Sequence, residues 1–174
     1  MGDELQELQE SAEHGHHNPN LAPVSLTMAV LAVLVAVASL LGHRAHTEEV
    51  VLQALASDQW AYYQAKNIRQ HEDELFVAMN NAGTAADVRE KYVQEAERYK
   101  KDKDEIQEKA RDLEKEVAQE RRRADRYDLA EVFLEIGLVI TSITLLSGRR
   151  IFWHLGIVLA VVGVVVAVMG ATVH

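Results

Sequence analysis

The chain has 174 residues, a formal net charge of −9 at pH 7 and no cysteine. The negative charge argues against nucleic acid as the main partner, because phosphate binding needs a positive surface. The lack of cysteine excludes disulfides, thiolate catalysis and cysteine-based metal sites. Hydrophobic residues are concentrated toward the two ends of the chain around a polar middle, so each segment is interpreted separately.

Residues 1–22 are expected to form a flexible acidic tail, with five acidic residues and no Lys or Arg. The stretch "HGHH" contains His14, His16 and His17, whose imidazoles could bind a transition metal. The neighbouring Pro19 and the polar surroundings indicate a solvated segment instead. We therefore expect no metal site and no cofactor.

Residues 23–43 are predicted to form the first transmembrane helix. The 19 residues from Val24 to Gly42 carry no charged side chain, and they give about 28 Å of helix, close to the hydrocarbon thickness of a bilayer. The preceding tail lacks basic residues and no convincing cleavage site follows, so a removable signal peptide is the weaker interpretation.

Residues 44–128 are predicted to form an extramembrane helical hairpin. The segment from His43 to Asp128 holds 16 of the 18 basic and 20 of the 27 acidic residues. Its one good break is "NNAGTAAD", which places a turn near 80–84, with Thr84 and Asp87 resembling a capping box at the start of the next helix.

Both halves of this hairpin show helical periodicity. The first half has an irregular apolar stripe, assisted by Trp60 and Ile68: Val51, Leu55, Tyr62, Ala65, Phe76 and Met79. The second half follows a heptad pattern, typical of a coiled coil, that continues into the next apolar segment. Its positions are Tyr92, Ala96, Tyr99, Lys103, Ile106, Ala110, Leu113, Val117, Glu120, Ala124, Tyr127 and Glu131.

Residues 129–147 and 151–173 are predicted to be the second and third transmembrane helices, joined by a tight turn at "SGRR". Arg149, Arg150 and Trp153 are suited to anchor the third helix at the interface. The uninterrupted apolar run of the second helix is too short to cross a bilayer, so a spanning helix necessarily includes Glu131 and Glu135.

Glu131, Glu135 and Ser142 occupy one face of the second span. A charged side chain that faces lipid at the depth of Glu135 costs on the order of a few kcal/mol. We therefore expect this intramembrane polar face to meet other helices. It could serve a hydrogen-bonded helix contact or line a proton or cation path.

Small residues recur at spacings of four and three on two of the spans, which favours close packing between helices. On the first span they are Ser25, Ala29, Ala32, Ala36 and Ser39. On the third span they are Gly156, Ala160, Gly163, Ala167 and Gly170. The pattern leaves open whether these seams meet within one chain or between subunits, but together they predict a homo-oligomer.

The stretch "APVSLTMAVLAVLVAVASLLGHRAHTEEVVLQALASDQWAYYQAKNIRQH" resembles the bacterial family catalogued as domain of unknown function 4337. The later stretch "YDLAEVFLEIGLVITSITLL" and the last span are also similar to it. The resemblance implies a prokaryotic membrane protein, and it supplies no activity, substrate or catalytic residue.

The predicted fold is an all-α membrane protein with three transmembrane helices and a long antiparallel hairpin between the first two. In the bacterial inner membrane, the positive-inside rule puts the hairpin in the cytoplasm, because it brings Arg44 and four arginines within residues 121–126 close to the membrane. His71 lacks the second histidine of a zincin helix, and neither a phosphate-binding loop nor a nucleophile elbow occurs, so we expect no enzyme. Two hypotheses remain, a structural or interaction protein carrying a charged stalk, with a protein partner at the hairpin tip, or an oligomeric transporter.

Overall fold

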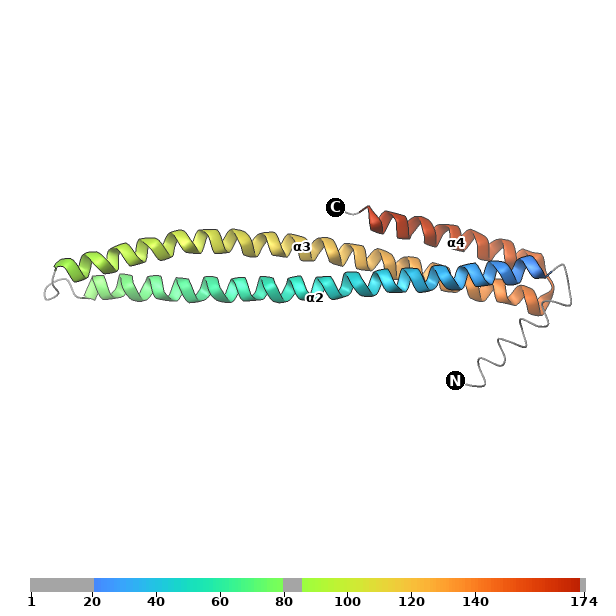
Figure 1. Cartoon of the computed structure of the whole chain (residues 1–174), viewed down its shortest axis with the longest axis horizontal. Helices are drawn as coiled ribbons and strands as arrows, with labels where there is room; N and C mark the ends of the chain where they lie inside the picture. The colour runs from blue at the N-terminus through green and yellow to red at the C-terminus, as the bar shows by residue number, and fades with distance from the viewer. Residues whose placement is uncertain (1–20, 80–85, 173–174) are drawn as a thin grey trace, which may run out of the picture. The chain divides into compact units, whose positions relative to one another are not determined.

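The computed structural model describes residues 21–79 and 86–172, and its secondary structure is helical (Figure 1). Helix α2 covers Ala22–Met79, α3 covers Ala86–Ser147 and α4 covers Arg150–Ala171. Since no proline follows Pro23, nothing in the sequence interrupts the 58 residues of α2 or the 62 residues of α3. The predicted all-helical class is confirmed. The turn expected near 80–84 lies outside the described residues, as do the three tail histidines.

All three helices are long and apolar enough to cross a membrane. Each contains a window of 18 residues with a mean hydropathy of 2.0 or more. The apolar parts fall at the start of α2, at the end of α3 and along α4, where the sequence predicts spans. This composition is that of a protein associated with a membrane.

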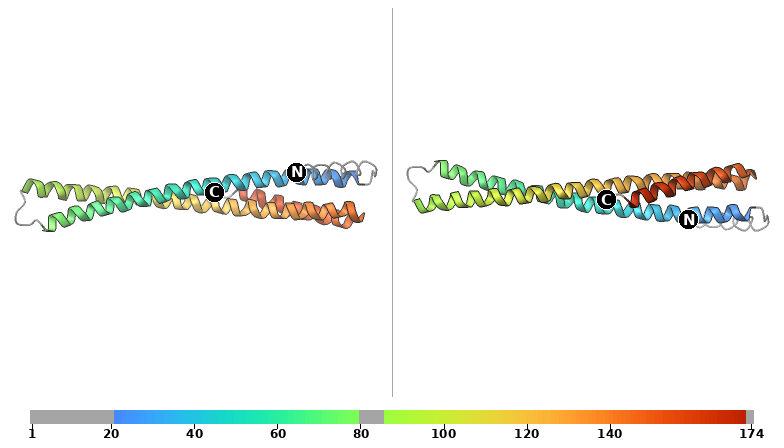
Figure 2. Two further views of the ribbon diagram at one scale, coloured as in Figure 1. Left: turned by 90° about the horizontal axis from the view of Figure 1, so that it is seen from below. Right: turned by 90° about the horizontal axis from the view of Figure 1, so that it is seen from above.

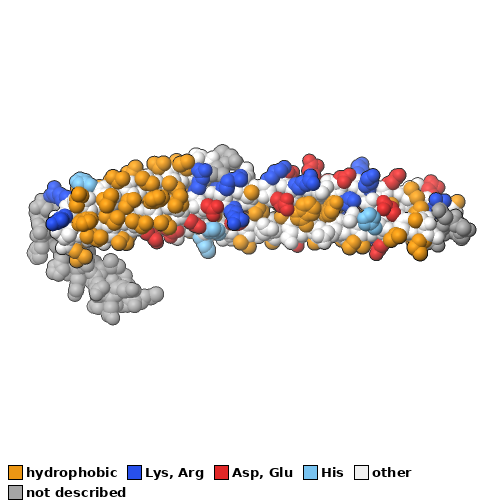
Figure 3. Space-filling model, turned by 180° about the vertical axis from the view of Figure 1, so that it is seen from behind, with side chains coloured by type: hydrophobic (Ala, Val, Ile, Leu, Met, Phe, Trp, Pro, Cys, Tyr) orange, Lys and Arg blue, Asp and Glu red, His pale blue; other side chains and the backbone are white. Residues whose placement is uncertain are grey.

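Contacts divide the described chain into two units. The apolar unit comprises residues 21–46 and 121–172, and the charged unit comprises residues 47–79 and 86–120. Hydrophobic side chains cover much of the visible face of the apolar unit, whereas basic and acidic side chains are scattered over the charged unit (Figure 3). Both α2 and α3 contribute to each unit.

In the apolar unit, α2, α3 and α4 lie side by side (Figures 1 and 2). Leu31 and Ala38 of α2 pack with Leu134 of α3, and Ala160 of α4 closes this cluster. A second cluster of the same three helices consists of Ala45, Ala124 and Tyr127, with Leu41 and Ala167 packed against it.

Glycine ends α3 at the expected turn. Gly148 has φ 67°, a left-handed conformation that glycine adopts without steric cost, and its N–H donates to the Thr144 carbonyl at 2.9 Å. Only Gly148 and Arg149 separate α3 from α4, so the chain reverses within two residues.

In the charged unit, α2 and α3 run antiparallel, because contacts pair rising numbers on α2 with falling numbers on α3. The pairs run from Trp60 with Glu114 to Phe76 with Tyr92. All twelve positions of the predicted α3 heptad pattern are buried or half-buried in their respective units.

The stripe predicted on α2 is wrong for five of its six positions. Only Phe76 is half-buried, whereas the other five side chains are exposed. The face of α2 toward α3 is instead a regular heptad pattern with many polar residues: Glu49, Leu52, Ala56, Gln59, Tyr63, Lys66, Gln70, Asp73 and Val77. Hydrophobicity alone selected the wrong face, because α2 is apolar on its outer side as well.

Candidate functional site

The inner face of α3 in the apolar unit combines small and polar residues with the large apolar Leu134. Buried positions recur at spacings of four and three: Ala130, Leu134, Gly137, Thr141 and Thr144. Small side chains allow neighbouring helices to approach closely, which is how helices associate where no water drives them together.

The third-span seam packs against this face within the same chain. A Cβ atom on Gly156 would collide with Thr141 Oγ1 and lie 2.7 Å from the Gly137 carbonyl oxygen. A Cβ atom on Gly163 would lie 2.9 Å from Leu134 Cγ. These glycines are therefore fitted to α3. Gly170 is also buried, while Ala160 and Ala167 are half-buried.

The first-span seam lies differently. Ala29, Ala32 and Ala36 are exposed, while Ser25 and Ser39 are half-buried. The inner face of α2 is formed by other residues, among them Leu31 and Ala38. Among the described residues, the three alanines of the first seam are therefore not packed against the third-span seam.

Two buried threonines on α3 were not identified from the sequence. Thr141 Oγ1 donates to the Gly137 carbonyl at 2.7 Å, one turn earlier on the same helix. Thr144 is equally buried, and its Oγ1 has no hydrogen-bond partner among the described residues. The signal that could have found them is the spacing of Gly137, Thr141 and Thr144, which continues the small-residue pattern of Ala130.

The predicted intramembrane polar face is only partly buried among the described helices. Glu135 is exposed, while Glu131 and Ser142 are half-buried. Ser142 Oγ donates to the Val139 carbonyl at 2.7 Å, and neither glutamate has a polar partner among the described residues. The buried face of α3 passes through Leu134, one residue before Glu135, because α3 contacts both α2 and α4 here.

Glu135 also lies well inside the apolar part of α3. Ser147, at the end of the helix, lies twelve positions after Glu135, which is about 18 Å at 1.5 Å per residue. A hydrocarbon layer is about 30 Å thick. A carboxyl group at this depth of a bilayer requires water or a polar partner, since a charged side chain facing lipid is costly.

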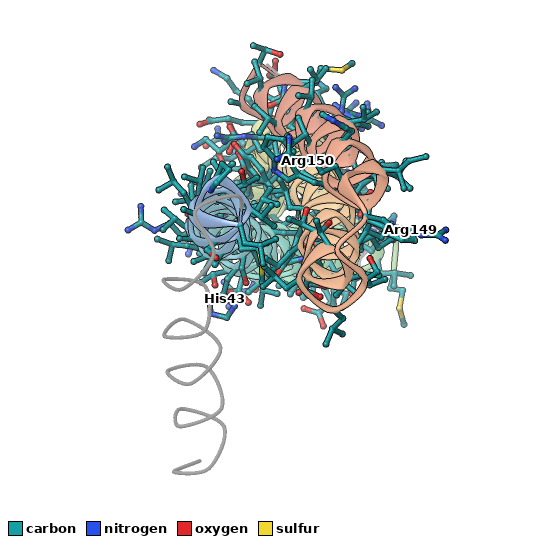
Figure 4. The ribbon with its side chains drawn as sticks, turned by 90° about the vertical axis from the view of Figure 1, so that its right-hand side faces the viewer. His43, Arg149 and Arg150 are labelled. Atoms are coloured by element: carbon teal, nitrogen blue, oxygen red, sulfur yellow. The ribbon has the colours of Figure 1, made fainter. Side chains whose placement is uncertain are left out.

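Polar contacts tie the ends of the apolar unit. Near the turn, Trp153 Nε1 donates to Thr27 Oγ1 at 3.1 Å, linking α4 to α2. Arg149 points outward from the helices at this end (Figure 4). At the other end, Arg126 donates to the Met169 carbonyl at 3.3 Å, where a cation suits the C-terminus of α4.

The charged unit has a polar centre between its helices. Lys66 Nζ donates to Asp102 Oδ2 at 2.9 Å, and the Lys66 side chain is 14% exposed. Its ammonium also lies 4.9 Å from the centre of the Tyr99 ring and 5.5 Å from that of Tyr62. Hydrogen bonding to Asp102 raises the pKa of Lys66, and the same bond lowers the pKa of Asp102.

Lys103, a polar position in the α3 heptad pattern, is hydrogen-bonded to residues of α2. Its Nζ donates to Asn67 Oδ1 at 3.0 Å and to Gln70 Oε1 at 3.1 Å. Gln70 is buried and donates in turn to Glu74 Oε1 at 2.8 Å. A buried polar layer of this kind fixes the register of two helices, because a shift of one turn would leave these groups unpaired.

The Asp73 carboxyl group is placed unfavourably between α2 and α3 of this unit. Its Oδ2 is buried without a hydrogen-bond partner among the described residues. Burial raises the pKa of Asp73, and the nearby carboxylates of Glu95 and Glu72 raise it further. Across residues 21–79 and 86–172, no group of three or more His, Asp or Glu is placed to hold a metal ion.

The described residues define the class of this molecule, an all-helical protein with three helices long and apolar enough to cross a membrane. The chain belongs to the family described as "Domain of unknown function (DUF4337)", which matches residues 20–173. The resemblance inferred from the sequence is therefore confirmed. No curated protein and no solved structure matches the chain.

Proposed function

We propose that this protein is a membrane-anchored structural or interaction protein of the bacterial inner membrane. Several copies assemble through their membrane helices and carry a charged coiled-coil stalk on the cytoplasmic side. This role requires no catalytic residues, and the unbroken α2 and α3 helices support it because they would join the anchor directly to the stalk.

One observation carries the proposed assembly, the Glu135 carboxyl group on the outer surface of the apolar unit. Exposure of an ionised carboxylate to lipid would cost on the order of a few kcal/mol. A helix of a second copy would exclude lipid and supply hydrogen-bonding groups. The exposed alanines of the first span offer further surface for close contact between copies.

The alternative proposal is an oligomer that conducts protons or cations past Glu131, Glu135 and Ser142. The same exposure of Glu135 favours it, because in a ring of copies this face of α3 could line a wet path. A single chain with three candidate spans encloses no pore, so this proposal also requires an assembly.

The two proposals are separated by replacing Glu135 and measuring both assembly and flux. Glu135→Gln keeps a hydrogen-bonding side chain, so the structural proposal predicts an unchanged oligomer in nanodiscs and no ion flux in proteoliposomes for either protein. The transport proposal predicts flux for the wild type and its loss in Glu135→Gln. If Glu135→Leu assembles as the wild type does, Glu135 is no part of the contact.

A further inference from the structure

Helix α2 has a second heptad pattern in the charged unit, on the face opposite the one that packs against α3. We call it the outer stripe. Its positions follow spacings of four and three, and every one of them is exposed. They are Val50, Ala54, Ser57, Ala61, Gln64, Ile68, His71, Leu75 and Ala78.

The outer stripe contains no Asp, Glu, Lys or Arg, although residues 47–79 contain eight of them. Its larger side chains are well exposed, Val50 at 68%, Ile68 at 58% and Leu75 at 59%. A solvent-facing helix normally carries its charges on the face away from the core. A continuous uncharged face at heptad spacing is typical of a surface that contacts another helix.

The outer face of α3 in the same unit differs from the outer stripe of α2 in its charge. Six of its eight positions at the same spacings are charged, as expected for a solvated surface. They are Gln94, Arg98, Lys101, Glu105, Glu108, Asp112, Lys115 and Gln119. The absence of charge is therefore particular to α2 and does not follow from the composition of the unit.

One part of the outer stripe borders a shallow hollow whose lining has the spacing of a helix-packing site. His71, Glu74, Leu75 and Ala78 line a surface hollow of about 360 Å³. In a coiled coil, each apolar side chain of one helix enters a hole formed by four residues of the facing helix. Such a hole has residues at positions i, i+3, i+4 and i+7, which is the spacing of these four.

We propose that a second copy of this chain packs along the outer stripe, with α2 against α2, parallel and in register. This inference rests on the proposed assembly and names its contact outside the membrane. Two copies with the same membrane orientation have parallel α2 helices, so each stripe residue meets its own counterpart. Uncharged residues can lie opposite their own counterparts without repulsion, whereas the charged outer face of α3 would place like charges opposite each other.

The positions that flank the outer stripe agree with this arrangement. In a parallel pair, a flanking residue meets the residue five positions later on the other helix. No such pair brings two like charges together. The pairs are Gln53 with Asp58, Trp60 with Ala65, Asn67 with Glu72, and Glu74 with Met79.

The same heptad positions continue toward the N-terminus of α2. They fall on six residues that are exposed in the apolar unit and none of which is Asp, Glu, Lys or Arg: Leu26, Ala29, Val33, Ala36, Leu40 and His43. Ala29 and Ala36 belong to the first-span seam, and both are exposed among the described residues. Exposed positions at heptad spacing that lack Asp, Glu, Lys and Arg therefore occur on α2 in each unit.

Disulfide formation between single cysteines tests this contact in the full-length protein. The chain has no native cysteine, and a disulfide requires Cα atoms within about 7 Å. Ala61→Cys lies on the outer stripe, while Ala118→Cys is an exposed alanine of α3 in the same unit. In nanodiscs treated with a mild oxidant, we expect Ala61→Cys to form a dimer and Ala118→Cys to remain monomeric on denaturing gels.

Native mass spectrometry of the same nanodiscs separates the possible failures. If the protein is oligomeric but Ala61→Cys gives no more dimer than Ala118→Cys, the stripe contact is wrong while the proposed assembly stands. If the protein is monomeric, both are wrong. Adding Ile68→Asp to Ala61→Cys should reduce the disulfide-linked fraction at least tenfold, and Lys101→Asp should leave it unchanged. An unchanged fraction with Ile68→Asp would also overturn the contact.

Discussion

Replacement of Gly156 by alanine tests the packing of α4 on α3. The added Cβ atom would collide with Thr141 Oγ1 and lie 2.7 Å from the Gly137 carbonyl oxygen. The threonine side chain can rotate, but the carbonyl belongs to the helix backbone, so α4 must move away from α3. Overpacking of this kind costs about 1–3 kcal/mol, and we expect the apolar unit to lose about that much stability.

The loss can be measured by unfolding the protein with SDS from a mild detergent. With Trp60→Phe as background, Trp153 is the only tryptophan and its fluorescence reports on α4. Gly156→Ala should unfold at lower SDS than the background protein. Thr141→Ala added to Gly156→Ala should restore only part of the loss, because the Gly137 carbonyl remains. Val158→Ala, at an exposed position of α4, is the control, and an equal loss in this control would refute the argument.

Three further predictions concern the charged unit and the topology. The pKa of Asp73 is raised in the folded protein, so ionisation of Asp73 lowers the stability of the fold as pH rises above 3.8. Asp73→Asn should therefore have a higher melting temperature than the wild type at pH 7, measured by circular dichroism. Equal melting temperatures would contradict this. The pKa of Asp102 is lowered in the folded protein, so Asp102 stabilises the fold above pH 3.8, and this stabilisation is lost as pH falls through the folded-state pKa. Asp102→Asn should have a lower melting temperature than the wild type at pH 7 but not at strongly acidic pH. For a cytoplasmic hairpin, an impermeant thiol reagent on cells with an accessible periplasm should label Ser11→Cys but not Asn81→Cys, and the opposite result would reverse the orientation.

Much of the fold could be predicted from the sequence, because hydrophobic length and the lack of proline determine long helices. The α3 heptad pattern was also predictable, since most of its positions are apolar and only a few are polar exceptions. Lys103 is one such exception, bonded to Asn67 and Gln70. Its partners are 33 and 36 residues away, beyond the reach of any local pattern.

The contacts of α2 could not be predicted in this way. Its inner face includes Lys66, Gln70 and Asp73, while its outer face includes Val50 and Ile68. A rule that buries the more apolar face therefore selects the wrong one. The exposure of Glu135 could not be predicted either. Leu134, one residue earlier, is buried because α3 packs against both α2 and α4 at this point.

The central claim, that several copies assemble in the membrane, is tested most directly by native mass spectrometry of the wild-type protein in nanodiscs. The chain has a mass of 19.5 kDa. The proposed assembly predicts a dominant species at two or more times this mass, in whole-number steps, maintained at low protein-to-nanodisc ratios. A dominant species at the mass of one chain would contradict it, and Glu135 would then face lipid or water without a second copy.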